Sequence, residues 1–580
     1  MKKTKQLAAV LLSLVMLLAL VIPASAAGPY SITIRNDKPG HTYEAYQIFA
    51  GTVSDDDMDV ATDPGPMLGD ITWGSGVDAN EYANLLTALK ADETIGERFD
   101  AINDATDAAA IAAALDKATT ADAEAFANVV SGFLSTTATE STAGDGVYNI
   151  TDLAAGYYLV KDQDGSLQGD ADTATEYIVQ VLGHVQMEPK SSDIPTLEKK
   201  VAEQGKGNEG KYNQDGGYGT YYNDVADWNI GDRVPFKLIG SIPDMDAYDT
   251  YQYIFHDTIS AGLTLDINSF DVYVAQEKYQ DPVALKWNEV PAENYTLTQT
   301  ADGFTLAIDN LKEFPYVNQE GRKYILVFYD AELNGNAEIG LPGNENSAYL
   351  EFSNNPNGNG TGRTEDDKVI VFTYELDGTK VDGETQAALQ NAQFVLLNGA
   401  KSEAAMVENG KVTGWVKVDS DAAAGDVQMP ETYEQWVARY GDQNVILTSA
   451  ADGAFNIAGL DDGTYFLREI QAPNGYNLLE GDVQLVITAD TANGQNWAGA
   501  PDLALRDLNM TITVGEAGPT HVPGDRADGT VGVTVENNGG ATLPETGGMG
   551  TTLFYIIGGL LVVGAGVLLV VRIRMKAHNE

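Results

Sequence analysis

Hydrophobic and polar residues alternate along most of the chain, which is the pattern of β-strands with one buried face. The alternation begins at Tyr30, is interrupted, and resumes at Val147. The interruption, residues 79–133, is rich in Ala and carries Leu, Ile and Phe at helical spacing. Residues 27–190 are therefore predicted to form an N-terminal β-sandwich domain with a helical insertion.

The following part of the chain has short alternating strands separated by Gly, Asp, Asn and Pro, the spacing of antiparallel sandwiches. The Asn- and Gly-rich phrase NNPNGNGTG indicates a linker. We expect a central domain at 191–360 and a C-terminal domain at 363–541, with one short helix near 431–439. The predicted fold class is all-β, with tandem immunoglobulin-like sandwiches.

Two apolar segments flank these domains. The first follows three lysines and ends at a small-residue cleavage pattern, so residues 1–26 are predicted to be a secretory signal peptide. The second, residues 553–571, carries no charge and reaches the length of about 20 residues that a membrane-spanning helix needs. The basic tail 572–580 has the positive charge expected on the cytoplasmic side.

The pentapeptide Leu543-Pro544-Glu545-Thr546-Gly547 stands directly before the second apolar segment. Together with the spanning segment and the short basic tail, it resembles the sorting signal of Gram-positive surface proteins. The resemblance implies that sortase, a cysteine transpeptidase, cuts between Thr546 and Gly547 and passes the Thr carbonyl to an amine. The alternative is a plain single-span anchor in which the LPETG sequence is incidental.

Composition restricts the function classes. The 34 basic and 85 acidic residues give a formal charge of −51, which argues against nucleic acid as a partner. Cys is absent, so an exported chain must rely on its cores or on a cross-link other than a disulfide. No cofactor or metal is expected, and the acidic run at 55–59 lacks the ligand spacing of a calcium loop. We interpret that run as a solvated loop.

Polar residues fall on strand faces that the alternation assigns to the core. They are Lys199, Asp257 and Asn346 in the central domain, and Lys380, Glu469 and Asn537 in the C-terminal domain. Burial favours a neutral lysine amine and a protonated carboxyl group. The amine can then attack an Asn carbonyl that the acid polarises, with loss of ammonia. The product would be a Lys–Asn isopeptide bond, formed once and autocatalytically.

Two other interpretations of these residues remain open at this stage. Each polar residue could be a strand-end group at the surface, or each set could be a buried hydrogen-bonded triad without a covalent bond.

Several phrases carry a family resemblance. YFLREIQAPNGY resembles the E-box of Gram-positive major pilins, and TKVD, AQFVLL and VENNGGATLPETGG match the surrounding collagen-adhesin B-type (Cna-B) domain. TLEKKV, HDTISAGLTL and NSAYLEFSNNPN are similar to the central pilin domain, which carries its own isopeptide bond. The resemblance implies two bonds: Lys380–Asn537 assisted by Glu469, and Lys199–Asn346 assisted by Asp257.

Lys190 is the predicted intersubunit lysine. It falls on the solvent-facing parity of its strand, next to the junction of the first two domains. In backbone pilins the attacking lysine lies in WxxxVxVYPK; this chain has VLGHVQMEPK, in which Val185, Pro189 and Lys190 match and the Trp, the second Val and the Tyr are replaced. An ordinary surface lysine is the alternative interpretation, and Lys161 and Lys200 are the next candidates.

These features predict a structural shaft subunit of a surface pilus rather than an enzyme. Sortase would join Thr546 of one subunit to Lys190 of the next, and peptidoglycan would hold the polymer at the cell wall. The expected partners are sortase, further copies of this chain, tip and base pilins, and a host ligand that the sequence does not identify. The alternative is a monomeric wall-anchored adhesin; a wall-anchored enzyme ranks lower, because no HExxH, GxSxG or phosphate-loop motif is present.

Overall fold

The computed structural model describes most of the chain between the two predicted end segments. The described residues are 29–54, 67–144, 146–167, 169, 172–188, 194–203, 222–278, 288–356, 360–418, 429–491, 497, 499–515 and 517–540. Several predicted features lie outside them: the signal peptide at 1–26, the acidic run at 55–59, Lys190, the motif at 543–547, the apolar segment at 553–571 and the tail at 572–580. Within the described residues, no helix is both long and apolar enough to cross a membrane.

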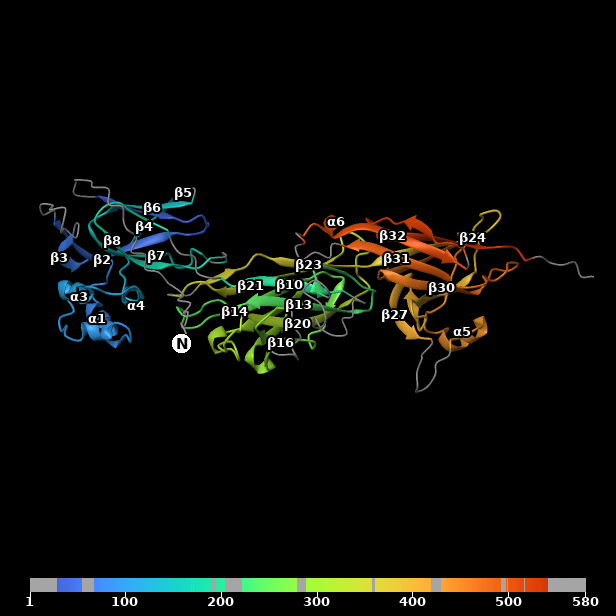
Figure 1. Ribbon diagram of the computed structural model, residues 1–580, viewed down its shortest axis with the longest axis horizontal. Helices are drawn as coiled ribbons and strands as arrows, with labels where there is room; N and C mark the ends of the chain where they lie inside the picture. The colour runs from blue at the N-terminus through green and yellow to red at the C-terminus, as the bar shows by residue number, and fades with distance from the viewer. Residues whose placement is uncertain are drawn as a thin grey trace, which may run out of the picture.

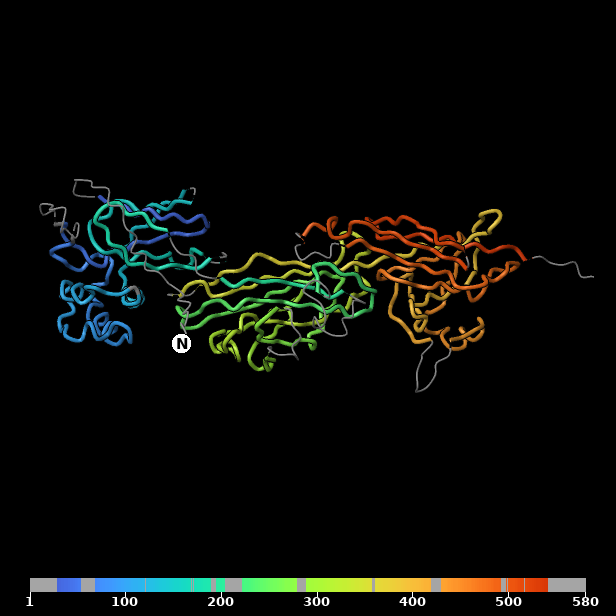
Figure 2. The backbone as a smooth tube through the Cα atoms, in the orientation of Figure 1, coloured from blue at the N-terminus to red at the C-terminus, as the bar shows by residue number. Residues whose placement is uncertain are grey.

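Strands dominate the described residues and the helices are short, which confirms the all-β class. Figure 1 shows three strand-rich units that follow one another along the long axis in chain order, and the tube in Figure 2 shows the same succession from blue to red. We call them the first, central and C-terminal units.

The first unit pairs two sheets, with strand orders β5-β6-β1-β9 and β3-β2-β7-β8, and β4 joins β2. Its strands are β1 (Tyr30–Arg35), β2 (Tyr43–Ser54), β3 (Met67–Trp73), β4 (Thr139–Glu140), β5 (Thr142–Gly144), β6 (Val147–Leu153), β7 (Gly156–Asp162), β8 (Glu176–Val181) and β9 (Val185–Met187). The buried residues Ile32, Ile34 and Ile150 lie between the sheets, as the alternation predicts.

The helical insertion is present between β3 and β4. It consists of α1 (Tyr82–Ala91), α2 (Gly96–Phe99), α3 (Ala108–Ala114) and α4 (Thr120–Ser131). Thr119 and Asp122 form a reciprocal capping box at the start of α4, satisfying backbone N–H groups that a helix end leaves open. Leu85, Phe99 and Phe126 pack in one core with Ile48 and Leu159 of the neighbouring sheet, so the insertion covers one sheet face.

The central unit contains two larger sheets, ordered β11-β10-β13-β20-β16-β17 with β15 on β20, and β12-β23-β21-β14-β19-β18 with β22 on β21. Their bounds are β10 (Leu197–Ala202), β11 (Tyr222–Asn223), β12 (Val225–Asp227), β13 (Arg233–Ser241), β14 (Tyr253–Ile259), β15 (Leu263–Leu265), β16 (Asp271–Ala275), β17 (Asn288–Glu289), β18 (Thr296–Gln299), β19 (Gly303–Ile308), β20 (Tyr324–Leu333), β21 (Asn344–Ser353), β22 (Thr361–Arg363) and β23 (Asp367–Phe372). Two 3₁₀ turns, η2 (Ala292–Asn294) and η3 (Leu311–Glu313), connect strands.

The C-terminal unit is one eleven-stranded sheet, ordered β33-β32-β31-β30-β25-β26-β27-β29-β24-β34, with β28 on β25. Its bounds are β24 (Tyr374–Asp382), β25 (Gln393–Asn398), β26 (Glu403–Glu408), β27 (Lys411–Lys417), β28 (Leu447–Thr448), β29 (Ala454–Leu460), β30 (Gly463–Gln471), β31 (Val483–Thr491), β32 (Leu505–Val514), β33 (Thr520–Pro523) and β34 (Thr530–Asn537). The helices are α5 (Tyr433–Tyr440), which confirms the predicted short helix, and α6 (Pro501–Ala504).

Strand β23 corrects the predicted boundary at residue 363. It pairs with β21, with Asn346 opposite Val369, and so belongs to a sheet of the central unit. Its odd residues Val369 and Val371 pack in the central core, whereas Ile370 and Phe372 pack in the core of the C-terminal unit. Because the even residues of β23 pack in the same core as β24, the alternation of β24 extends back into β23. Periodicity alone does not reveal which sheet a strand joins, so the predicted boundary is too early.

Candidate functional site

The central unit brings Lys199, Asp257 and Asn346 together. Lys199 lies on β10 of one sheet, whereas Asp257 and Asn346 lie on neighbouring strands of the facing sheet. Asn346 is opposite Ile259, two residues from Asp257, so the two side chains are diagonal neighbours on one face. All three residues are buried, at 0%, 3% and 0% exposure respectively. The prediction that these polar residues point into an apolar core is therefore correct in geometry.

Tyr329 on β20 connects the three side chains. The Lys199 amine donates to the Asp257 carboxylate and, at 2.7 Å, to the Tyr329 hydroxyl. That hydroxyl donates to Asp257 Oδ2 at 2.8 Å and accepts from Asn346 Nδ2 at 2.9 Å. Sequence reasoning missed Tyr329, because it lies in the near-continuous apolar run of β20, where alternation does not mark individual positions.

Two oxygens of this cluster have no hydrogen-bond partner among the described residues: Oδ1 of Asp257 and Oδ1 of Asn346. A buried polar atom without a partner costs about 1–3 kcal/mol. A proton on the Asp257 carboxyl group would let it donate to the Asn346 carbonyl and remove both penalties. The same hydrogen bond would polarise the carbonyl carbon toward attack by an amine.

The surroundings of Lys199 and Asp257 favour their neutral forms. Burial lowers the pKa of Lys199, although the Asp257 charge opposes the shift. Burial also raises the pKa of Asp257, although Lys199 opposes it. The Lys199 amine lies 5.7 Å from the Phe236 ring centroid and 5.3 Å from that of Tyr329, so it has little access to water. Proton transfer from the amine to the carboxylate yields the nucleophile and the general acid in one step.

The C-terminal unit repeats the residue types in another geometry. Lys380 on β24 and Asn537 on β34 lie on adjacent parallel strands, where Lys380 is opposite Val535 and Asn537 is opposite Asp382. The two residues are thus offset by two positions on one face. Both are buried, and so is Glu469 on β30.

Hydrogen bonds hold the C-terminal set in place. Asn537 Nδ2 donates to Glu469 Oε2 at 3.0 Å and to the Asn477 carbonyl at 2.7 Å. Glu469 Oε2 also accepts from the Leu479 N–H at 2.9 Å, and the Lys380 amine donates to the Val535 carbonyl at 3.0 Å. Among the described residues, Glu469 Oε1 and Asn537 Oδ1 have no partner. As in the central unit, an acid oxygen and an amide oxygen are both left open.

Burial lowers the pKa of Lys380 to about 8, against the opposing charge of Glu469. On the order of one tenth of such amines is neutral at pH 7, compared with fewer than one in a thousand for a free lysine. Both units therefore hold a lysine amine, an acid and an Asn carboxamide in a setting suited to amide exchange.

Lys161 and Lys200, the next candidates for the intersubunit lysine after Lys190, are poorly accessible. Lys200 is 3% exposed and pairs with Asp224, so the expectation that an external enzyme could reach it is wrong. It is buried because apolar residues cover both faces of β10, not only the inner one. Lys161 has a side chain only 13% exposed and pairs with Asp164 at 2.9 Å.

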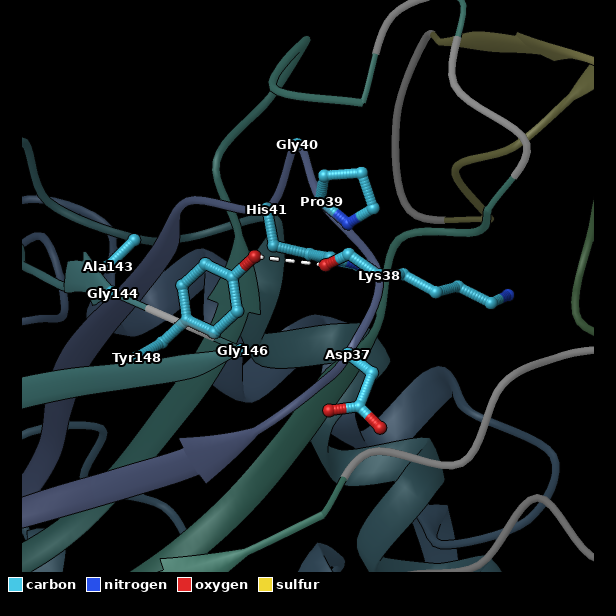
Figure 3. A pocket seen from close by; sticks show the side chains of 9 residues that line it. All are labelled: Asp37, Lys38, Pro39, Gly40, His41, Ala143, Gly144, Gly146 and Tyr148. Carbon is cyan, nitrogen blue, oxygen red and sulfur yellow. Dashed lines mark hydrogen bonds between the residues drawn. The ribbon is translucent and has the colours of Figure 1, made fainter.

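A polar cluster in the first unit also escaped sequence reasoning. His41 is buried, with Nδ1 at 2.7 Å from Asp162 and Nε2 at 3.0 Å from Asp172. His41 lines an open cleft of about 400 Å³. Figure 3 shows the residues that line it, with the Tyr148 hydroxyl donating to the Lys38 carbonyl. Burial opposes protonation, but the hydrogen bonds and charges of the two aspartates outweigh it and raise the pKa of His41 to about 9.

The His41 cluster fixes a segment that touches the central unit. Beyond Asp162 and before β8, the N–H groups of Gly169 and Ala174 donate to the carbonyls of Thr361 and Asn354, both at 2.7 Å. The Asn354 side chain in turn donates to the Leu167 carbonyl at 2.8 Å. The charged His41 therefore stabilises the segment through which the first two units meet.

Comparison with known proteins gives two matched segments. A prealbumin-like fold domain of the SpaA type matches residues 375–498, and the LPXTG cell wall anchor motif matches residues 535–577. The second match confirms the cell-wall location expected from the LPETG sequence.

One relative is the trypsin-resistant surface T6 protein of Streptococcus pyogenes serotype M6. It is 25% identical over 395 residues, which are 60% of this chain and 66% of that protein, slightly less than two thirds. Similar solved structures include the T6 backbone pilin of that serotype, with 16% identity and a TM-score of 0.49, covering 89% of this chain and 100% of that chain. Another is the full-length major pilin SpaD of Corynebacterium diphtheriae, with 14% identity and a TM-score of 0.44, covering 88% of this chain and 98% of that chain. The matched segments show a SpaA-type prealbumin-like domain and an LPXTG cell wall anchor in this chain, and the T6 relative is by its name a surface protein.

The pH dependence of stability tests the His41 cluster. Because the pKa of His41 rises from about 6.5 unfolded to about 9 folded, its stabilisation is complete below pH 6.5 and is lost as pH rises through 9. His41→Gln should remove roughly 1–3 kcal/mol of pH-dependent unfolding free energy of the first unit. Denaturant unfolding of both chains at pH 6 and pH 10 measures this difference in unfolding free energy. The exposed His521→Gln is the control, and an unchanged pH profile in His41→Gln would contradict the assignment.

A conservative change at Tyr329 tests its part in the central site. Tyr329→Phe keeps the ring but removes the hydroxyl that holds Lys199, Asp257 and Asn346 together. We expect the mass of the unchanged chain to be lower than the sequence mass by one ammonia for each bond formed. In most molecules of Tyr329→Phe the ammonia of the central bond should not be lost. Tyr324→Phe, on the same strand, should behave like the unchanged chain. Equal masses for Tyr329→Phe and the unchanged chain would show that the hydroxyl is dispensable.

Proposed function

We propose that this chain is the shaft subunit of a covalently polymerised surface pilus, with one internal Lys–Asn cross-link in each of its last two units. The observation that carries the proposal is the recurrence of a buried Lys–acid–Asn set in both units. In each, the lysine lies on the first strand and the asparagine near the end of the unit. Such a placement serves a protein that carries tension along its length.

The proposed reaction balances without an added reactant. The Lys199 amine passes a proton to the Asp257 carboxylate, and its lone pair attacks Cγ of Asn346. The protonated Asp257 donates to the amide oxygen and returns protons to the departing nitrogen. A C–N bond to Lys199 forms, the C–N bond to the Asn346 nitrogen breaks, and ammonia leaves. Lys380, Glu469 and Asn537 would follow the same steps.

The cross-links would shorten the path that force takes through the chain. Tension entering at Lys199 would pass through the bond to Asn346 and then along β21 and β23, which are paired to each other. It would continue into β24 and cross from Lys380 to Asn537, the last residue of β34. The strands between each lysine and its asparagine would carry no load, so they could not be peeled apart.

Polymerisation and anchoring complete the proposal. After export directed by residues 1–26 and retention by the apolar segment 553–571, sortase would cut after Thr546. It would join that residue to Lys190 of the next subunit, at the junction between the first and central units. The last subunit would be passed to peptidoglycan, and tip and base pilins would complete the fibre. No catalytic turnover and no cofactor is required of the chain itself.

The intersubunit link gives a direct test. Peptide mass spectrometry of material released from the producer's cell wall should find Thr546 joined to Lys190. Lys190→Arg should abolish the ladder of polymers on a denaturing gel, because an arginine guanidinium stays protonated and is not a nucleophile. Lys117→Arg, an exposed site in the first unit, is the control.

Two outcomes would contradict this function or its details. Thr546 joined only to wall peptide, with Lys190 free, would identify a monomeric anchored adhesin. A polymer ladder that persists in Lys190→Arg would show that another lysine is the acceptor.

A further inference from the structure

Three carboxylates meet at the joint between the central and C-terminal units. Glu203 follows β10, Asp227 ends β12, and Asp461 follows β29 of the C-terminal unit. One oxygen from each lies within 4.8 Å of the others, and all three residues are buried. Glu203 and Asp227 both belong to the central unit, and the contact between the two units adds Asp461 to them.

The joint around them is built by specific hydrogen bonds. The Ile230 N–H donates to the Gly459 carbonyl at 3.0 Å, and the Asp461 N–H donates to Asn229 Oδ1 at 3.1 Å. The Tyr374 hydroxyl donates to Asp227 Oδ2 at 3.0 Å. A side chain on Gly459, whose φ is +93°, would collide with Ile230 at 2.7 Å, so the close approach also depends on glycine. Backbone and side-chain contacts between the two units therefore hold the segments that carry Asp227 and Asp461 together.

A second observation points to a ligand. Asp461 is 7% exposed, and its Oδ1 has no hydrogen-bond partner among the described residues, although it lies in the three-carboxylate cluster. Buried carboxylates normally have a partner, because an isolated buried charge is very costly. A cation held between the carboxylates would supply the partner that Asp461 Oδ1 lacks.

We propose that a divalent cation, Ca²⁺ by its ligand chemistry, binds between Glu203, Asp227 and Asp461 and joins the central unit to the C-terminal unit. Oxygen is the only donor type in the cluster, which suits a hard cation and not Zn²⁺ or Cu²⁺. Ca²⁺ takes six to eight oxygens in irregular geometry, and three carboxylates with water can supply them. Mg²⁺ would require a near-octahedral arrangement.

The cluster also has a route to solvent. A cleft of about 460 Å³, lined by residues that include Asn229, Asp232 and Asp461, opens at this joint. Asp461 is thus the member of the cluster that lies next to this cleft. Because the ion takes ligands from both units, its binding would limit bending at the joint. This role adds to the proposed isopeptide bonds and does not depend on them.

The test is a calcium titration of the full chain in detergent. After treatment with a chelator, addition of CaCl₂ should raise the unfolding temperature by several degrees at a hundredfold excess over Kd. Isothermal titration calorimetry should report one site per chain. Asp461→Asn should lose at least tenfold in affinity, whereas Asp490→Asn, at an exposed position on β31, should bind as the unchanged chain does.

Two results would overturn the proposal. The first is an unfolding temperature of the unchanged chain that calcium does not affect. The second is a calcium response that Asp461→Asn retains in full. If Asp461→Asn fails to fold, Glu203→Gln is tested by the same criteria.

Discussion

The burial of a lysine amine beside an acid and an amide is the constraint on which the central and C-terminal units depend. A protonated amine in an apolar core is costly, and so is an ionised carboxylate. Lys199 and Lys380 are both fully enclosed, and in each set an acid oxygen and an Asn oxygen lack hydrogen bonds among the described residues. The proposed proton transfer and amide exchange would relieve these costs. The charged pair would become a neutral isopeptide amide and a protonated acid that can donate to the amide oxygen, and ammonia would leave.

The two sets reach this condition through different folds. In the central unit the lysine approaches from one sheet and the asparagine from the other, with Tyr329 between them. In the C-terminal unit Lys380 and Asn537 lie on adjacent parallel strands, and backbone groups of Val535 and Asn477 take the place of a bridging tyrosine. What the units share is the chemistry of the buried groups and the order of lysine and asparagine along the chain.

Strand alternation predicted that the six site residues are buried, and most of them lie on strands with one clear inner face. Strand β10 is an exception, because apolar side chains cover both of its faces. Lys199 and Lys200 are therefore both buried there, although alternation predicted burial of Lys199 alone. Tyr329 and the cluster of Glu203, Asp227 and Asp461 were missed for another reason. Their significance depends on contacts between distant strands or between units, and no local period records such contacts. The boundary at β23 was misplaced because its two faces serve two cores.

Single-molecule force spectroscopy tests the central claim most directly, by stretching the chain from a point before Lys199 to a point after Asn537. With both cross-links present, neither the segment from Lys199 to Asn346, which are 147 positions apart (346 − 199), nor that from Lys380 to Asn537, 157 positions apart (537 − 380), can extend. The account predicts no step from the extension of either closed segment at forces below bond rupture. Steps of about 500 Å for either unit, the length of such a segment fully extended, would contradict it.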